Sequence, residues 1–218
     1  ATTGTKFRAF GFRVPLTSQP SNFICGDNTT MMLQAYGKTN EGSGESCEVI
    51  TGFSGDKDLD VWFRATTDDD GLPDSVTPNI VVAGKAISAQ NDTVNENLKI
   101  NFVNGESSFD IAYPNTAQII DLNFRLDTAP YDGIEFNEMA ASTNSFVVYP
   151  SQFQITAKNG AIDITGNSSN SLTTHTAGQA FNLGLTAQCS DGSTATDFKP
   201  TQSATGIMAY LQRTGPLG

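Results

Sequence analysis

The sequence predicts an all-β protein built from two tandem immunoglobulin-like antiparallel β-sandwich domains. Three observations support this fold class. Apolar and polar residues alternate with period two in many short runs, an Asn-Gly pair separates two of these runs, and no window of a dozen residues combines helical spacing with a capping box. The 218 residues suffice for one large domain or two small ones.

Each alternating run is expected to bury one face of a strand. In the run 121–127, Leu122, Phe124 and Leu126 fall on one face and polar or charged residues fall on the other. Such a strand is half-buried in an antiparallel sheet. The same alternation predicts buried faces at Phe10, Phe12 and Val14, at Met31, Leu33 and Ala35, at Leu59, Val61, Phe63 and Ala65, and at Phe109, Ile111 and Tyr113.

The stretch KINFVNGESSFDIAYP predicts a β-hairpin. Asn104 and Gly105 stand between two strand-like runs. Asparagine followed by glycine favours the positive backbone angles of a two-residue hairpin turn.

A second unit is expected after the stretch SFVVYP, where the alternation restarts. Residues 1–146 contain 9 basic and 20 acidic side chains, whereas residues 147–218 contain 3 of each. We therefore predict an acidic domain at 1–146 and a smaller domain at 147–218, which is either minimal or cut short, because about 100 residues are usual for such a sandwich. Its predicted buried residues are Phe153, Ile155, Ala157, Phe181, Leu183, Leu185 and Ala187.

The net charge of −11 excludes two classes of partner from the prediction, nucleic acid and anionic membranes, because both repel an acidic protein. No run of about 18 apolar residues predicts a membrane span. The amino end lacks the layout of a signal peptide, and a chain that begins at Ala1 and ends in GPLG is expected to be a piece of a longer protein.

The three cysteines allow one internal disulfide. We predict that Cys25 pairs with Cys47, because the two flank one strand-like run and would close a loop worth roughly 3 kcal/mol. Two reduced thiols are the alternative. Cys189 is then left over, and we expect it to be buried or to have a partner outside this sequence.

The stretch TTDDDGLPDS predicts either a weak calcium site or a solvated acidic turn, and the turn is favoured. With Gly71 at position six of a calcium-binding loop, ligand positions are filled by carboxylates and by one backbone carbonyl. However, Thr66 replaces the first carboxylate and Thr77 replaces the final glutamate. The candidate ligands are Asp68, Asp70, Leu72 and Asp74.

No catalytic residues are predicted, and we expect the chain not to be an enzyme. His175, the only histidine, lies among small polar residues typical of a loop. The acidic group Asp132, Glu135 and Glu138 is better explained as an exposed acidic edge than as the carboxylate pair of a glycoside hydrolase.

Trp62 is the candidate ligand-binding aromatic residue. It alternates with Val61 and Phe63, so it is expected on the face opposite the core. There it either contacts a sugar or is covered by a loop or by the neighbouring unit, and packing against the predicted disulfide is a third possibility.

The chain resembles the carboxyl-terminal region of the MshQ family in five stretches: FRAFGFRVPL, FICGDNTTMMLQAYG, SCEVITGFSGDKDLDVWF, VNGESSFDIAYP and AGQAFNLGLTAQCSDGSTATDF. Members of that family are large bacterial envelope proteins associated with biogenesis of the mannose-sensitive haemagglutinin pilus. The resemblance implies a location outside the cell or at its surface, protein partners of the pilus or envelope, and no active site.

The sequence thus predicts a non-catalytic structural or adhesion module of a bacterial surface or pilus-associated protein. A carbohydrate-binding module, attached to a larger secreted enzyme and binding a surface glycan, is the alternative. An exposed row of aromatic side chains would favour this alternative.

Overall fold

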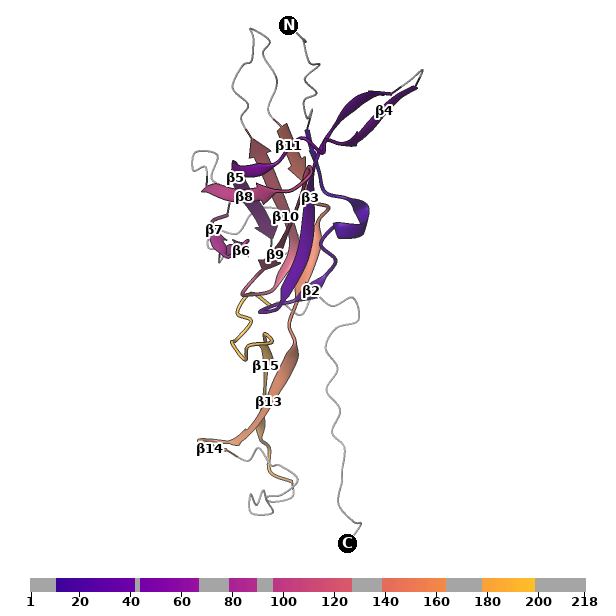
Figure 1. The fold of residues 1–218 in the computed structure, drawn as a ribbon. Coiled ribbons are helices and arrows are strands. Elements are labelled where there is room, and N and C mark those ends of the chain that lie inside the picture. Colours follow the sequence, from indigo (N-terminus) through magenta and orange to yellow (C-terminus); the bar gives the residue numbers. More distant parts are fainter. Residues whose placement is uncertain are drawn as a thin grey trace, which may run out of the picture.

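The computed structural model describes residues 11–41, 44–66, 79–89, 96–126, 139–163 and 178–198. These residues form strands β1 to β15 and one short 3-10 helix, η1 (Leu16–Ser18), so the predicted all-β class is confirmed (Figure 1). None of the described helices is long and apolar enough to span a membrane.

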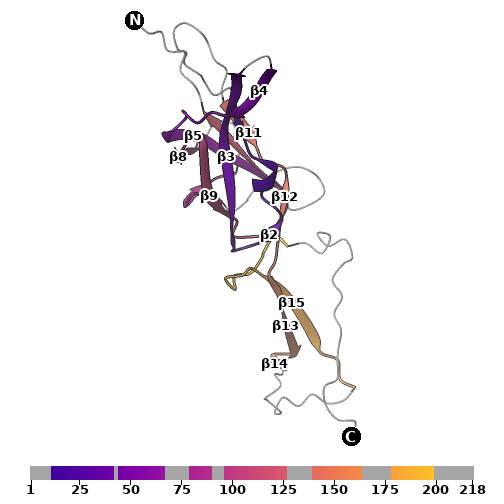
Figure 2. The ribbon, with the colours of Figure 1, turned by 45° about the vertical axis from the view of Figure 1, so that its right-hand side comes forward.

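The first sheet is built around the long strand β3 (Asn28–Glu41). Its order is β1–β3–β9–β6–β7, and β4 pairs with the second half of β3, where the β3–β4 hairpin extends away from the rest of the sheet (Figures 1 and 2). Every pairing in this sheet is antiparallel. The other strands are β1 (Gly11–Arg13), β4 (Gly44–Val49), β6 (Ile80–Val82), β7 (Lys85–Ile87) and β9 (Glu106–Ala112).

The second sheet has β5 (Gly55–Thr66) and β10 (Ala117–Leu126) at its centre. Its order is β2–β12–β10–β5–β8, and β11 pairs with β10. The pairing of β2 with β12 is parallel, whereas the other pairings in this sheet are antiparallel. The other strands are β2 (Phe23–Ile24), β8 (Glu96–Phe102), β11 (Met139–Ser142) and β12 (Phe146–Tyr149).

The two sheets enclose one apolar core, and the predicted strips supply most of it. The described members of those strips in the first unit are at most 9% exposed, except Leu126, which is partly buried against the core. Phe10 and the side chain of Ala65 lie outside the described residues. Each large side chain buried in this way stabilises the fold by about 1.5–3 kcal/mol. The strips are Phe12 and Val14; Met31, Leu33 and Ala35; Leu59, Val61 and Phe63; Phe109, Ile111 and Tyr113; and Leu122 and Phe124.

The predicted Asn-Gly turn is confirmed, but it joins strands of different sheets. Asn104 and Gly105 have φ angles of 52° and 82°, and Val103 and Glu106 exchange both backbone hydrogen bonds, at 2.8 and 3.1 Å. Beyond these residues, β8 pairs with β5 in the second sheet and β9 pairs with β3 in the first. The turn is therefore a corner between the two layers of the sandwich.

A third, smaller sheet lies beyond one end of this sandwich (Figures 1 and 2). Its order is β14–β13–β15, and both pairings are antiparallel. The preceding strand, β12, still belongs to the first sandwich, so the first unit continues through Tyr149, past the predicted boundary at residue 146. The strands of the small sheet are β13 (Gln152–Asn159), β14 (Ile162–Asp163) and β15 (Asn182–Gln188).

The apolar face of the small sheet differs from the prediction of a buried core. The register places Phe153, Ile155 and Ala157 opposite Ala187, Leu185 and Leu183, so these side chains share one face. Only Ala187 is buried, and the five large residues of the prediction remain substantially exposed because the described residues include no second layer over them. Their exposed fractions are Phe153 38%, Ile155 51%, Phe181 40%, Leu183 44% and Leu185 39%.

Candidate functional site

The disulfide of this chain joins Cys25 to Cys189, not Cys25 to Cys47 as predicted. The Cα atoms of Cys25 and Cys189 are 4.8 Å apart, within the usual range for a disulfide, and both residues are fully buried. Cys47 is a free, exposed thiol. Cys189 is therefore buried, as one of the two expectations held, but its partner lies within this chain.

Strand geometry explains why the predicted pairing fails. Cys47 lies on β4, in register with Lys38, whereas Cys25 precedes the start of β3 at Asn28. Lys38 and Asn28 are ten positions apart on one continuous strand, which corresponds to roughly 33 Å. A disulfide requires Cα atoms within about 7 Å, so Cys47 lies far beyond the reach of Cys25.

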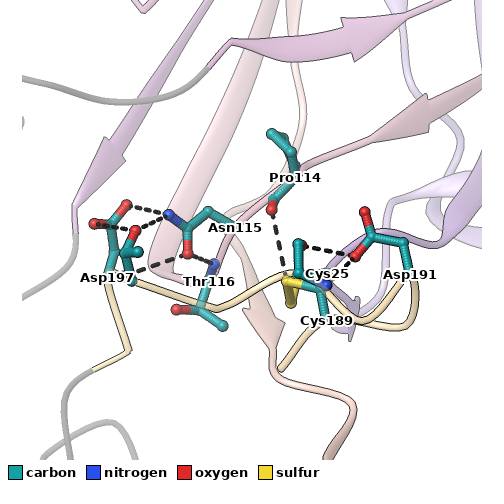
Figure 3. The surroundings of a disulfide bond; sticks show 9 residues. Cys25, Pro114, Asn115, Thr116, Cys189, Asp191 and Asp197 are labelled. Carbon is teal, nitrogen blue, oxygen red and sulfur yellow. Dashed lines mark hydrogen bonds between the residues drawn. A yellow bond between two sulfur atoms is a disulfide. The ribbon is translucent and has the colours of Figure 1, made fainter. Parts of the chain in front are cut away.

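The disulfide lies where the first sandwich meets the small sheet, a region that we call the junction (Figure 3). Cys25 follows β2, and its backbone N–H donates to the carbonyl of Tyr149, the last residue of β12, at 2.8 Å. Cys189 follows β15, and the backbone N–H of Ser190 donates to the carbonyl of Cys25 at 2.9 Å. Backbone hydrogen bonds to residues of both units therefore lie directly beside the disulfide.

Close packing continues at Gly26. Its φ of +85° suits glycine, and a Cβ atom added there would lie 2.8 Å from the hydroxyl oxygen of Ser190. The backbone N–H of Gly26 donates to the carbonyl of Tyr113 at 3.0 Å. Glycine after Cys25 therefore allows the turn that follows Cys189 to approach the first sandwich closely.

Asn115 provides a second attachment at the junction (Figure 3). Its side chain is 8% exposed, and its amide nitrogen donates to Thr196 Oγ1 and to Asp197 Oδ2, each at 2.8 Å. Its carbonyl oxygen accepts bonds from the backbone N–H groups of Thr116 and Asp197, at 2.8 and 3.3 Å. One buried side chain of the first sandwich therefore holds the segment after Cys189.

Asp191 stabilises the turn that follows Cys189. Its carboxylate accepts hydrogen bonds from the hydroxyl and from the backbone N–H of Ser193, at 2.7 and 2.9 Å. These two bonds hold the pKa of Asp191 below its ordinary value of 3.8, because they favour the charged form. The backbone N–H of Cys189 donates to the carbonyl of Ser193, so this turn closes back on the disulfide.

Sequence reasoning missed the junction, although the sequence carries a weak signal for it. Cys25 and Cys189 each come directly after a strand and are each followed by a turn sequence, Gly-Asp after Cys25 and Ser-Asp-Gly after Cys189. Cys47 instead lies inside a strand. Cysteines at the ends of strands are close in space only when the topology brings those ends together, and the sequence does not specify that topology.

The predicted calcium ligands Asp68, Asp70, Leu72 and Asp74 lie outside the described residues. The described part of the chain contains no group of three or more His, Cys, Asp or Glu side chains arranged to hold a metal ion. The choice between a calcium loop and an acidic turn therefore stays a prediction.

Trp62 lies on the outer face of β5, between buried Val61 and Phe63, and is half-buried. The guanidinium carbon of Arg125 lies 5.6 Å from the centre of its ring, and Arg125 also pairs with Asp60 at 2.9 Å. One neighbour along the same face, Arg64, pairs with Asp121 at 2.8 Å. Trp62 is therefore part of a polar surface in which the charged neighbours bind one another.

Among the described residues, the tyrosines do not form an aromatic row with Trp62. Tyr36 lies in the first sheet with Arg13 over its ring, and Tyr113 is fully buried in the core. Tyr149 is 40% exposed at the end of β12, and Tyr131 lies outside the described residues. The described outer face around Trp62 thus offers one aromatic ring to a ligand.

Comparison with known protein families gives a match over the first sandwich. A family model described as a domain of unknown function (DUF6701), first Ig-like domain, matches residues 2–138. A search of curated proteins and a search of solved structures found no match. The matched range covers most of the first sandwich, including both long central strands of its second sheet.

Proposed function

Because the chain belongs to the family of the domain of unknown function DUF6701, first Ig-like domain, we propose that it is a non-catalytic structural module of a bacterial surface protein. We propose further that this protein acts in type IV pilus assembly or in attachment through the pilus. The resemblance to the MshQ family supports the pilus assignment, and the Ig-like family supports a modular structural role.

The observation that carries the proposal is the buried disulfide at the junction. Such bonds persist in oxidising environments outside the cytoplasm, and Cys25 and Cys189 are both fully buried in this chain. A bond between two β units fixes one unit on the other. This arrangement suits a protein that holds or spaces other parts of an envelope assembly.

Two exposed features offer surfaces to protein partners of the pilus or envelope. The β3–β4 hairpin extends from the first sandwich, and the small sheet presents an apolar face with Ile155 51% exposed. A contiguous exposed apolar face is typical of a surface that another protein element covers. We propose that such contacts, rather than catalysis, are the work of this module.

Surface labelling tests the location and attachment assays test the role. Intact bacteria that produce the parent protein are treated with a membrane-impermeant maleimide, which is expected to label exposed Cys47 and not a Cys47→Ser control. A chromosomal deletion of residues 11–198 is expected to reduce pilus number or pilus-dependent attachment. Labelling only after lysis would refute the surface location, and unchanged piliation and attachment would refute the role.

A surface glycan is the alternative partner, and half-buried Trp62 on the outer face of β5 is the residue that supports it. A Trp62→Ala variant of the isolated chain is expected to lose binding on a glycan array if a sugar stacks on this ring. An Arg64→Ala variant, changed on the same face, is the matched control. Trp62 would be excluded as a sugar contact if the unchanged chain and both variants bound equally, or if none of the three bound.

A further inference from the structure

The Cys25–Cys189 bond closes a very long covalent loop. The two residues are 164 positions apart in sequence, but their Cα atoms are 4.8 Å apart. A chain segment of that length, fully extended, spans roughly 55 nm. The disulfide therefore replaces a path of tens of nanometres by a path of less than one.

Almost the whole fold lies inside this loop. Strands β3 to β15 are all located between Cys25 and Cys189, including both central strands of the second sheet and the complete small sheet. Outside the loop are 24 residues before Cys25 and 29 after Cys189. The described elements among them are β1, η1 and β2.

We propose that the Cys25–Cys189 bond makes this module a link that bears tension, in which tension between the segment before Cys25 and the segment after Cys189 passes directly through the disulfide. The loop between the two cysteines then carries no tension. Neither sheet of the first sandwich, apart from β1 and β2, can be pulled open, and the small sheet cannot be unravelled. This inference rests on the proposed surface role for its purpose, since a surface attachment must bear tension.

The surroundings of the bond suit this role. Both cysteines are fully buried, which keeps soluble reductants from the sulfur atoms while the fold is intact. The sulfur of Cys189 lies 3.5 Å from the carbonyl oxygen of Pro114, and the backbone of Cys25 is bonded to Tyr149 and Ser190. The disulfide that keeps tension off the first sandwich is thus itself buried against that sandwich.

The segments that do carry tension are held by short-range contacts. On the amino-terminal side, β1 pairs with β3 through Gly11, Phe12 and Arg13, and β2 pairs with β12. On the carboxyl-terminal side, Asn115 bonds Thr196 and Asp197, and the ring of Phe198 packs on that of Phe153 with 5.3 Å between their centres. Tension is expected to release these contacts first and then to act on the disulfide itself.

Single-molecule stretching tests the proposal. The 218-residue chain is fused at both ends to handle proteins and stretched in optical tweezers without reductant. The wild-type chain is expected to gain at most roughly 18 nm of contour length, which is what the 53 residues outside the loop supply. A Cys25→Ser/Cys189→Ser variant is expected to gain roughly 55 nm more.

The matched control is Cys47→Ser, which removes the free cysteine and is expected to keep the short limit. The total contour length at high force depends on how many residues are under tension, whether or not the variant folds. A double variant that is unfolded from the start therefore still gives the longer total contour length. The proposal would be overturned if the wild-type chain reached the longer contour length without reductant. It would also be overturned if the double variant kept the shorter contour length. A chain that passes this test but is absent from the cell surface would refute the proposed function alone.

Discussion

Asn115 shows how one buried side chain holds a distant segment of the chain at the junction. Its amide group makes hydrogen bonds to Thr196, Asp197 and the backbone of Thr116, and it is 8% exposed. A buried amide with its donors and acceptor satisfied contributes stability, and its partners incur a desolvation cost when it is removed. Asn115 therefore couples the loop between β9 and β10 to the segment after β15.

An Asn115→Ala substitution is expected to lower the free energy of unfolding by about 1–3 kcal/mol, because it leaves buried donors and acceptors without partners. Urea unfolding, followed by the fluorescence of Trp62, measures this difference, since the chain contains 1 Trp. Asn101→Ala is the control, because Asn101 is exposed and makes one side-chain bond, to Asp56. Equal losses in the two variants would show that Asn115 has no special role.

The carboxyl group of Asp191 should titrate below its ordinary pKa of 3.8, because the hydroxyl and backbone N–H of Ser193 stabilise its charged form. A depressed pKa contributes stability above the unfolded-state value and loses it as the pH falls through the folded value. NMR titration of the side-chain carboxyl carbon measures the midpoint. Ser193→Ala is expected to raise it, whereas Ser108→Ala, at an exposed position of β9, is expected to leave it unchanged. A midpoint that Ser193→Ala leaves in place would refute this cause.

At the scale of elements, the corner at Asn104 and Gly105 depends on a glycine in a crowded place. Gly105 has a φ of +82°, and a Cβ atom added there would lie 2.5 Å from the carbonyl oxygen of Ile50. The backbone also donates a hydrogen bond to Phe53 and accepts one from Ala35 at this residue. Backbone conformation and space both require glycine at this corner between the sheets.

A pair of glycine substitutions separates these two requirements. Gly84 has a similar φ, +79°, but open space around its missing side chain. Gly84→Ala is therefore expected to cost about 1–2 kcal/mol, the price of a left-handed residue. Gly105→Ala is expected to cost at least a further 1–3 kcal/mol, because backbone must move to admit the methyl group. Urea midpoints measure both, and equal losses would show that the corner is not crowded.

Local patterns predicted the strands better than their partners. The alternation of apolar residues identified the buried faces of β3, β5, β9 and β10, because burial of one face imposes period two on any strand. The same alternation placed Trp62 correctly on the outer face. It did not show that β8 and β9 separate into different sheets, because an Asn-Gly turn has the same local geometry in both cases.

The apolar face of β13 and β15 marks a second limit. Its alternation predicted a buried core, but alternation shows only that a face is apolar. Whether another layer covers that face depends on contacts elsewhere in the chain or in a partner. Phe153 and Leu185 remain 38% and 39% exposed for this reason.

At the scale of the whole molecule, the cysteine pairing depends on topology that no local pattern encodes. The parallel pairing of β2 with β12 brings residue 25 to the start of the small sheet, and the antiparallel pairing of β15 with β13 returns residue 189 to the same place. Closing a longer loop costs only slowly increasing entropy, so proximity in sequence is a weak guide to pairing. The predicted disulfide between Cys25 and Cys47 was wrong because it relied on proximity in sequence.

The same loop length makes the disulfide a large contributor to stability. Removing both partners, in Cys25→Ala/Cys189→Ala, is expected to lower the free energy of unfolding by roughly 5 kcal/mol, because a loop closed over 164 positions strongly restricts the unfolded chain. Cys47→Ala should leave it unchanged, since that thiol is free and exposed. Urea unfolding of both variants, again followed through Trp62, tests this expectation. If the double variant loses less than about 1 kcal/mol, the bond restricts only the junction, and the first sandwich owes its stability to its apolar core alone.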